Sequence, residues 1–362
     1  MFEFYNPRFW CLFLAIIVLG GTLSCGSPAE HLTLNGQTMG TTYHVSIANA
    51  PRGLSAREVG EAVEDTLSQV NSQFSNWLPD SDVSRFNRHA STDPFTLSDA
   101  FHDLLDIADE VHSASDGYFD LTLAPVVELW GFGPEARDKE APTAHAIEQA
   151  RLLTGQKRVL RRDRRAQTLT KMTPSVSLNV ASIAKGAGID ALAQQFIHLG
   201  LTDFMIEIGG DLRVVGLGPR GTPWRIGIET PAASRAVSDI VTISNRSMAT
   251  SGDYRNYFDE DGVRYSHILD ATTGRPITHS TASVTVLADT AARADAWATA
   301  LLAAGRKRGV MIAEQQGIAA LFLDRTIAVD AEAPARPANT DHAPIAFERY
   351  TTRAFDELAA ND

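Results

Sequence analysis

Residues 294–305 read ADAWATALLAAG, and this stretch predicts a core helix. Nearly every residue in it favours the helical state, and the closing Gly305 is a typical helix stop. Asp295 and Thr299 are four residues apart, so they lie on the same face of that helix. A buried carboxylate is costly unless it meets a cation or several hydrogen-bond donors. The stretch therefore indicates a polar site built into an apolar helix.

The composition is that of an ordinary globular protein. The chain has 362 residues, of which 44% are hydrophobic and 21% charged, enough for one large domain or two smaller ones. Its formal net charge is −12, from 44 acidic and 32 basic residues. An acidic chain without a long basic block is a poor candidate for nucleic-acid binding, so we expect no nucleic-acid partner. The one basic run, at 157–165, is interpreted as the exposed tip of a hairpin.

The N-terminus has the layout of a secretory signal. Arg8 precedes an apolar run at 9–19, and small residues then lead to Cys25. The run is too short for a comfortable transmembrane helix. A Cys directly after Leu23 and Ser24 resembles a bacterial lipobox, in which the Cys is lipidated and becomes the new N-terminus. We therefore expect a signal peptide at 1–24, a lipid-modified Cys25, and a tether at 25–31.

Helical and strand patterns are intermixed along the rest of the chain without a βαβ rhythm. Periodic apolar residues predict helices at 55–76, 99–113, 144–153 and 184–199. Strand patterns occur at 32–47, 204–208, 212–216, 224–229, 241–243 and 283–288, with a hairpin at 158–172. We therefore expect an α+β fold with antiparallel sheets packed against helices, and not a doubly wound parallel sheet.

Several common catalytic motifs are absent or misleading. The string GLGPRG at 216–221 matches the dinucleotide pattern G-x-G-x-x-G, but that fingerprint requires a helix to begin at its last glycine. Here a segment with strand character follows, so we reject a Rossmann site. The chain also lacks a G-x-S-x-G elbow, a Walker A lysine and a paired-histidine zinc motif. Because Cys11 and Cys25 are its only cysteines, the mature chain must use oxygen and nitrogen groups for any chemistry.

Short polar strings that contain glycine recur along the chain. They are TMGTT, DGYFD, NVASIAKG, IGGD, ATSGDYRNY and YSHILDATTG. Glycine beside Ser, Thr and Asp lets a backbone approach a phosphate or a nucleotide closely. One such string is commonplace as a turn, but this many, together with Asp295 and Thr299, suggest a shared pocket.

These strings, with SNWLPDSDVSRFN, WRIGIETP and the helix at 294–305, follow one another like the signature blocks of the ApbE family, which the chain resembles. The resemblance runs from residue 32 to residue 305. It implies an ApbE-like, T-fold-related domain over residues 32–362. It also implies the activity of a bacterial FAD:protein FMN transferase. Such an enzyme splits FAD in a Mg²⁺-dependent reaction, releases AMP, and attaches FMN through a phosphoester to a Ser or Thr of a target protein.

The resemblance further implies where the protein works. Members of the family are exported, often as lipoproteins. We therefore expect this chain on the periplasmic side of a bacterial membrane, with the inner membrane favoured over the outer one. Its partner would be a subunit of a membrane redox complex that carries the Ser or Thr to be flavinylated. The lipid on Cys25 would supply the membrane anchor.

The metal ligands are also implied by the resemblance. They would be Asp295 and Thr299, with backbone oxygens at Ala298 and Ser182. Mg²⁺ prefers oxygen ligands and often bridges carboxylates and phosphates. It would thereby offset the charge of the FAD pyrophosphate and of the departing AMP. The alternative is a structural Asp295 that is hydrogen-bonded to nearby amides.

The flavin and nucleotide contacts implied by the resemblance are Met39, Trp77, Tyr118, Phe119, Asp120, Asn179, Lys185, Ser251 and Leu269. Trp77 is suited to stacking on the isoalloxazine ring, although core packing is the alternative for it and for Met39. Asn179 departs from the family, which usually has Asp there, so that contact would be uncharged. Lys185 would pair with a phosphate or ribose oxygen; the alternative is a solvated lysine at the start of a helix.

His267, in YSHILD, is the best candidate for the general base. An imidazole with a near-neutral pKa takes a proton from an incoming hydroxyl. A structural histidine beside Ile268 and Leu269 is the alternative. Two other functions stay open. One is a Mg²⁺-dependent FAD pyrophosphatase that uses water as the nucleophile, and the other is a lipid-anchored flavin-binding protein without chemistry.

Overall fold

The computed structural model describes residues 30–134, 140–231, 236–260, 263–327 and 345–361. In this part of the chain, an antiparallel sheet with the strand order β1-β2-β6-β7-β10-β15-β16-β17 forms the scaffold. Its strands are β1 (Glu30–Thr38), β2 (Thr41–Ala50), β6 (Phe204–Ile208), β7 (Asp211–Val215), β10 (Arg246–Gly252), β15 (Thr281–Ala288), β16 (Ala319–Ile327) and β17 (Ile345–Thr351). The expected α+β fold with antiparallel sheets is confirmed.

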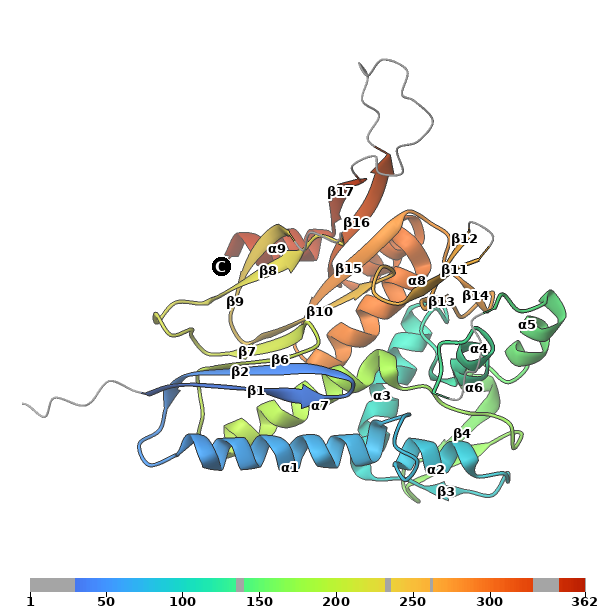
Figure 1. Ribbon diagram of the computed structural model, residues 1–362, viewed down its shortest axis with the longest axis horizontal. Helices are drawn as coiled ribbons and strands as arrows, with labels where there is room; N and C mark the ends of the chain where they lie inside the picture. Colours follow the sequence, from blue (N-terminus) through green and yellow to red (C-terminus); the bar gives the residue numbers. More distant parts are fainter. Residues whose placement is uncertain (1–29, 135–139, 232–235, 261–262, 328–344, 362) are drawn as a thin grey trace, which may run out of the picture.

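One face of the sheet is covered by helices (Figure 1). They are α1 (Ala56–Phe74), α7 (Ala181–His198) and α8 (Ala291–Gln316), with α3 (Asp99–Ala114) packed against α7 and α8. The periodic apolar residues of α1, among them Val59, Val63 and Leu67, are buried as their spacing predicts. Ser55 and Glu58 form a capping box that starts this helix.

The opposite face is covered by the hairpin of β8 (Trp224–Glu229) and β9 (Val237–Ile243) and by α9 (Arg353–Asn361). The GLGPRG string is the turn between β7 and β8, where the Gly218 amide donates to the Thr222 carbonyl at 2.8 Å. A strand follows the last glycine, so the rejection of a Rossmann site is confirmed.

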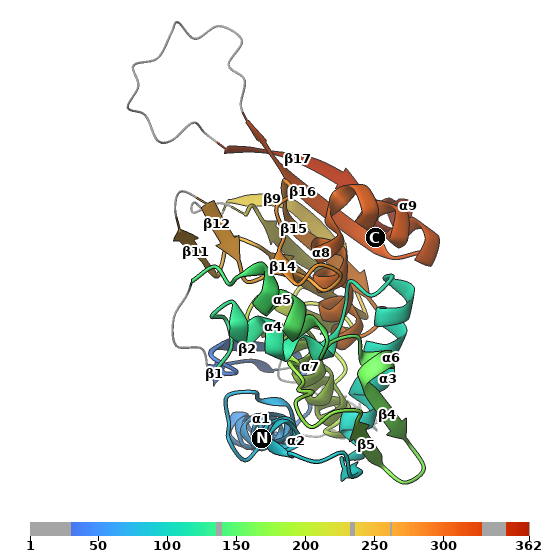
Figure 2. The same cartoon turned by 90° about the vertical axis from the view of Figure 1, so that its right-hand side faces the viewer.

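The remaining short elements surround the right-hand end of the sheet in Figure 1 and face the viewer in Figure 2. They are α2 (Asp82–Arg88), β3 (Phe95–Thr96), the 3₁₀ turn Leu121–Leu123, α4 (Ala124–Leu129), α5 (Ala144–Arg151), α6 (Gln156–Val159), β4 (Leu160–Asp163), β5 (Thr168–Lys171), β11 (Tyr257–Glu260), β12 (Val263–Ser266), β13 (Leu269–Asp270) and β14 (Arg275–Pro276).

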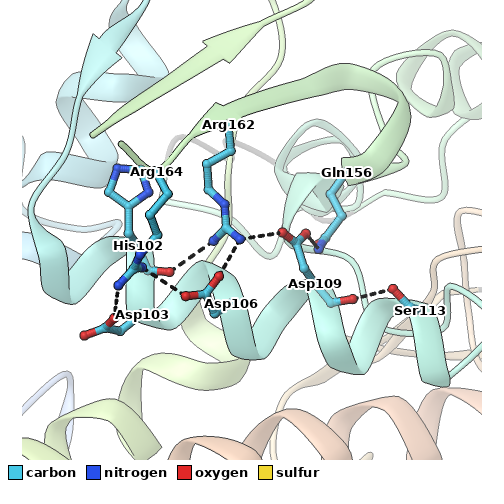
Figure 3. A network of polar contacts seen from close by, with 8 residues as sticks. All are labelled: His102, Asp103, Asp106, Asp109, Ser113, Gln156, Arg162 and Arg164. Atoms are coloured by element: carbon cyan, nitrogen blue, oxygen red, sulfur yellow. Dashed lines mark hydrogen bonds and ion pairs between the residues drawn. The ribbon is translucent and has the colours of Figure 1, made fainter. Parts of the chain in front are cut away.

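The predicted hairpin at 158–172 is present as β4 and β5, its tip is exposed, and two of its arginines form ion pairs (Figure 3). Arg162 is paired with Asp106 and Asp109, and Arg164 with Asp103 and Asp106. All three carboxylates belong to α3. Arg162 and Arg164 therefore tie the hairpin to this helix, a role that the local sequence does not reveal.

Helices α7 and α8 cross in direct contact because Gly186 lies at the crossing. A Cβ atom at this position would be only 2.4 Å from the carbonyl oxygen of Ala291. One turn later in α7, the Asp190 carboxylate accepts hydrogen bonds from the amides of Ala291 and Ala292, at 3.0 and 2.9 Å. It thereby caps the first turn of α8. This contact aims the next turn of α8, which carries Asp295, at the N-terminal part of α7.

Two elements differ from the sequence expectation. The segment 32–47 forms two paired strands because Met39 and Gly40 adopt positive φ angles of 50° and 73° and reverse the chain. Helix α8 does not end at Gly305: this residue, with φ 67° and ψ 164°, interrupts the helix, which then continues. Gly305 is therefore a kink, held where a Cβ atom would lie 2.5 Å from the ring of His279.

The expected signal peptide at 1–24 and Cys25 lie outside the described residues. Most of the expected tether at 25–31 does too, although β1 already begins at Glu30. In the described part of the chain, no helix is both long and apolar enough to cross a membrane.

Candidate active site

A cavity of about 370 Å³ lies where the start of α7, the end of β10, α8 and the neighbouring loops meet. The predicted site residues that line it are Trp77, Tyr118, Phe119, Asp120, Asn179, Ser182, Lys185, Ser251, His267, Leu269, Asp295 and Thr299. Met39 and Ala298 are not among the lining residues, and Cys25 lies outside the described part. Residues from distant parts of the chain thus share one cavity, as the recurring polar strings suggested.

Asp295 and Thr299 both face this cavity from α8, as their spacing predicts. Asp295 is only 2% exposed, and its carboxylate accepts a hydrogen bond from the Gly186 amide at 3.1 Å. The hydroxyl oxygens of Thr299 and Ser251 lie 3.2 Å apart. A carboxylate and two hydroxyls therefore meet at one wall.

The ammonium group of Lys185 lies between two buried carboxylates. Its Nζ is 3.0 Å from Asp295 Oδ1 and 2.8 Å from Asp211 Oδ2. Burial alone would lower the pKa of Lys185, but the two carboxylates outweigh it and hold the pKa above its ordinary value. For Asp295, burial is the largest influence and raises the pKa, against the opposing effect of Lys185. With all three groups ionised, this cluster carries one excess negative charge.

The donor set suits a hard divalent cation. Within the described ranges there is no group of three or more His, Cys, Asp or Glu side chains that would hold a metal. Mg²⁺ does not need one, because it keeps several water ligands and is bound by one or two carboxylates together with substrate phosphates. Asp295, Thr299 and Ser182 bring oxygen atoms to the cavity, and the excess charge beside Asp295 favours a cation.

A backbone carbonyl orients His267. Its Nδ1 is 2.8 Å from the Asn256 carbonyl oxygen, which only accepts hydrogen bonds, so in the neutral ring Nδ1 carries the proton and Nε2 keeps the lone pair. Burial lowers the pKa of His267 below its ordinary value. The Phe132 ring packs against it at an angle of 66°, with ring centroids 6.3 Å apart. His267 therefore has the tautomer and the charge state that a general base requires.

Asp120 and Asn179 line the cavity, but their side chains bind the backbone of the protein itself. Asp120 accepts hydrogen bonds from the amides of Thr122 and Gly155, at 2.8 and 2.7 Å. The side-chain oxygen of Asn179 accepts from the Ala181 amide at 3.0 Å. Both residues thus hold the cavity wall in shape, and their contact with a nucleotide stays a prediction.

The aromatic residue Trp77 is open to a ligand. It is 68% exposed although it lines the cavity, so core packing does not account for it. Apolar surface in the same lining comes from Leu123, Val127, Phe132, Ile268 and Leu269. Met39 fits the core alternative better, because a Cβ atom at Gly188 of α7 would lie 2.9 Å from its methyl carbon. Ala298 is fully buried.

Sequence reasoning did not single out Asp211, Arg255 or Phe132. Asp211 ends the IGGD string and Arg255 lies in ATSGDYRNY, so the strings that indicated a pocket contain the signal that would have found both. Phe132 lies in the segment after DGYFD, and its approach to His267 depends on tertiary packing.

A family model described as the ApbE family matches residues 39–322. This chain belongs to the ApbE family. The FAD:protein FMN transferase of Vibrio cholerae is 40% identical over 320 residues, which cover 88% of this chain and 94% of the relative. The FAD:protein FMN transferase of Escherichia coli K12 is 34% identical over 298 residues, covering 82% and 85%.

Solved ApbE structures share the fold. The flavin transferase ApbE from Vibrio cholerae has a TM-score of 0.79 and 37% identity, covering 91% of this chain and 99% of that one. The apo form of the Pseudomonas stutzeri flavinyl transferase ApbE also has a TM-score of 0.79 and 37% identity, covering 91% and 97%. The family resemblance that the signature strings indicate is confirmed.

Proposed function

We propose that this protein transfers the FMN part of FAD to a Ser or Thr hydroxyl of an acceptor protein and releases AMP. The observation that carries the proposal is the shared cavity. In it, His267 with a free Nε2, the oxygen wall of Asp295 and Thr299, and the exposed Trp77 line one space. The names of the relatives, FAD:protein FMN transferases, support the same reaction.

The proposed reaction is a phosphoryl-type transfer. The acceptor hydroxyl attacks the FMN-side phosphorus of FAD, and His267 Nε2 takes the hydroxyl proton while the new P–O bond forms. The bond from that phosphorus to the oxygen that bridges to AMP breaks, and AMP leaves with the bonding electron pair. No oxidation or reduction is involved.

We propose Mg²⁺ as the cation of this site, held by Asp295, Thr299 and the backbone oxygens of Ser182 and Ala298. When bound, it supplies positive charge that offsets the charge of the pyrophosphate. Lys185, on the same wall, brings an ammonium group for a phosphate or ribose oxygen. This wall therefore suits a pyrophosphate that binds together with a metal ion.

The reaction is tested with a candidate redox subunit as the acceptor. Incubation with FAD and Mg²⁺ should give covalent in-gel flavin fluorescence and AMP in equal amounts, the latter measured by HPLC. Free FMN with AMP, and no labelled acceptor, would identify a pyrophosphatase. FAD binding without any AMP would identify a flavin-binding protein.

The role of His267 has a pH signature. Because the base must be unprotonated, transfer should rise with pH through the lowered pKa of His267 and be level above about pH 6.5. His267→Gln should lower the rate by about 10²- to 10⁴-fold and leave FAD binding unchanged. A wild-type rate that keeps climbing above neutral pH in single-turnover measurements would contradict this assignment.

We further propose that the protein acts on the periplasmic side of a bacterial membrane, anchored through a lipid on Cys25, on a subunit of a membrane redox complex. The signal-like segment before Cys25 supports this location. Cys25→Ser should move the protein from the membrane pellet to the soluble fraction, as immunoblots of fractionated cells would show. Retention in the pellet would count against the anchor.

A further inference from the structure

Among the residues that line the cavity, Lys185, Arg255 and His267 are the side chains able to carry a positive charge. The charge of Lys185 is already balanced by Asp295 and Asp211. His267 is neutral near pH 7, because burial lowers its pKa. Among the lining residues of the described chain, Arg255 is therefore the permanently charged one that is not already held in an ion pair.

The surroundings of Arg255 support this reading. The guanidinium forms no ion pair with a carboxylate anywhere in the described ranges, although the chain as a whole is strongly acidic. One nitrogen donates to the Gly209 carbonyl oxygen at 3.0 Å, and the side chain of Tyr254 also contacts the guanidinium, with its ring centroid 5.8 Å from the guanidinium carbon. A guanidinium has five N–H donors in a planar fork, so most of them remain for a ligand. The side chain is exposed, as a ligand-binding group must be before its ligand arrives.

A glycine turn leaves room for this guanidinium. Gly209 and Gly210 join β6 to β7 with φ angles of 60° and 98°, which side chains rarely adopt. A Cβ atom at Gly210 would lie 3.3 Å from an Arg255 nitrogen. The turn therefore lets the arginine lie close against the backbone, where one carbonyl anchors it.

Arg255 is also tied to the general base through the chain. The next residue, Asn256, presents the carbonyl oxygen that accepts hydrogen bonds from both the backbone amide and Nδ1 of His267. The same short segment therefore brings a cation to the cavity and orients the base. A phosphate held by Arg255 would lie on the side of the cavity where the hydroxyl loses its proton.

We propose that Arg255 binds the pyrophosphate of FAD through its guanidinium fork. This inference rests on the proposed function and names a substrate-binding residue for it. A pyrophosphate is a doubly charged anion, and Arg pairs with phosphate oxygens in a bidentate manner that a Lys ammonium does not reproduce. Arg255 would supply charge to the substrate from the segment after β10, where it lies against the β6–β7 turn.

The test compares FAD with riboflavin, which has the same ring system and no phosphate. Binding is measured by quenching of flavin fluorescence, without acceptor, once with Mg²⁺ and once with EDTA. Arg255→Met should weaken FAD binding by on the order of 10- to 100-fold, the loss typical for hydrogen bonds to a charged group. Riboflavin binding should not change. The FAD affinity of Arg255→Lys should lie between those of the wild type and Arg255→Met, because a lysine keeps the charge and loses the planar fork of donors.

Arg225→Met is the matched control, because Arg225 is an exposed arginine on β8 that does not line the cavity. It should bind FAD like the wild type, which excludes a general effect of net charge. An FAD affinity of Arg255→Met within twofold of the wild type overturns the inference. Equal losses for FAD and riboflavin overturn it too, because they indicate a structural role. If the wild type neither prefers FAD to riboflavin nor labels an acceptor, the proposed function fails together with the inference.

Discussion

Two lysines in this protein, Lys171 and Lys185, have opposite surroundings. Lys171, at the end of β5, is 1% exposed, and its Nζ donates to the carbonyl oxygens of Asn87, His89 and Pro174 at 3.0, 3.0 and 3.3 Å. Burial lowers its pKa to about 8. Lys185 lies between two carboxylates that hold its pKa above the ordinary value in spite of burial.

The difference shows that burial of a charge does not by itself mark a functional site. Carbonyl dipoles satisfy the N–H donors of Lys171 without neutralising it, so this lysine joins the end of α2 to β5, and it does not line the cavity. The carboxylates around Lys185 neutralise it and leave an excess negative charge. A second cation can therefore be attracted to the Lys185 region, whereas the Lys171 region has no charge to offer one.

The largest effect should come from removing a carboxylate of the Lys185 region. Asp295→Ala should abolish flavin transfer, because it removes the charged side chain proposed to hold Mg²⁺. The protein should stay folded, since Asp211 still pairs with Lys185. In-gel flavin fluorescence and circular dichroism measure the two properties. Full transfer at saturating Mg²⁺ and FAD would contradict the metal assignment.

Asp324→Ala is the matched control for this change. Asp324 is also buried and ion-paired, with Arg306, but it does not line the cavity. Its loss should lower the thermal transition temperature and leave transfer per folded molecule unchanged.

Lys185→Met should have a smaller effect on transfer than Asp295→Ala, and it should increase the stabilisation of the protein by Mg²⁺. Two buried carboxylates would then lack their ammonium partner, so stability without metal should fall. Added Mg²⁺ would become the main counter-charge and should raise the transition temperature more than in the wild type. Transfer should drop by roughly 10- to 100-fold. Calorimetry with and without Mg²⁺ measures the shift, and Lys185→Arg, which keeps the charge, should respond like the wild type. An equal shift of the transition temperature by Mg²⁺ in the wild type and Lys185→Met would contradict the claim that the carboxylates around Lys185 attract a second cation.

The smallest effect on transfer is expected at Lys171, which does not line the cavity, and its contribution appears as a dependence of stability on pH. Because the pKa of Lys171 in the folded state, about 8, lies below its ordinary value of 10.5, the charged form costs stability at neutral pH. That cost disappears as the pH rises through this interval. Between pH 7 and pH 10.5, the free energy of unfolding of the wild type should therefore rise by up to about 3 kcal/mol relative to that of Lys171→Met. Urea unfolding at several pH values measures it, and a constant difference between the two proteins would show that the carbonyls compensate the charge fully.

Local patterns predicted much of the scaffold. Strands β6 and β8 have the expected bounds because side chains alternate across their faces, and α1 follows the helical spacing of its valines and leucine. The hairpin within 32–47 was missed, because the alternation continues across its turn and Met39 adopts a conformation unusual for a non-glycine residue. At Gly305 the sequence predicts a helix end, and the structure has a break between two helical segments of α8, because a helix stop and an interruption have the same local signal.

The sequence predicted which residues form the candidate site better than it predicted the contacts that they make. The glycine-containing strings contained most of the residues that line the cavity. They did not indicate that Asp120 would bind backbone amides, that Met39 would pack over α7, or that Arg255 would donate to the Gly209 carbonyl. Each of these outcomes depends on which neighbour another segment supplies.

By itself, the sequence determined that Asp295 and Thr299 share one face of a helix, because backbone hydrogen bonds impose the same period on every α-helix. Only the tertiary structure decided what lies opposite them: Lys185 from α7 and Ser251 from β10. Such contacts join residues far apart in the chain, and they depend on how closely whole elements pack, as at the crossing allowed by Gly186. No local pattern contains that information.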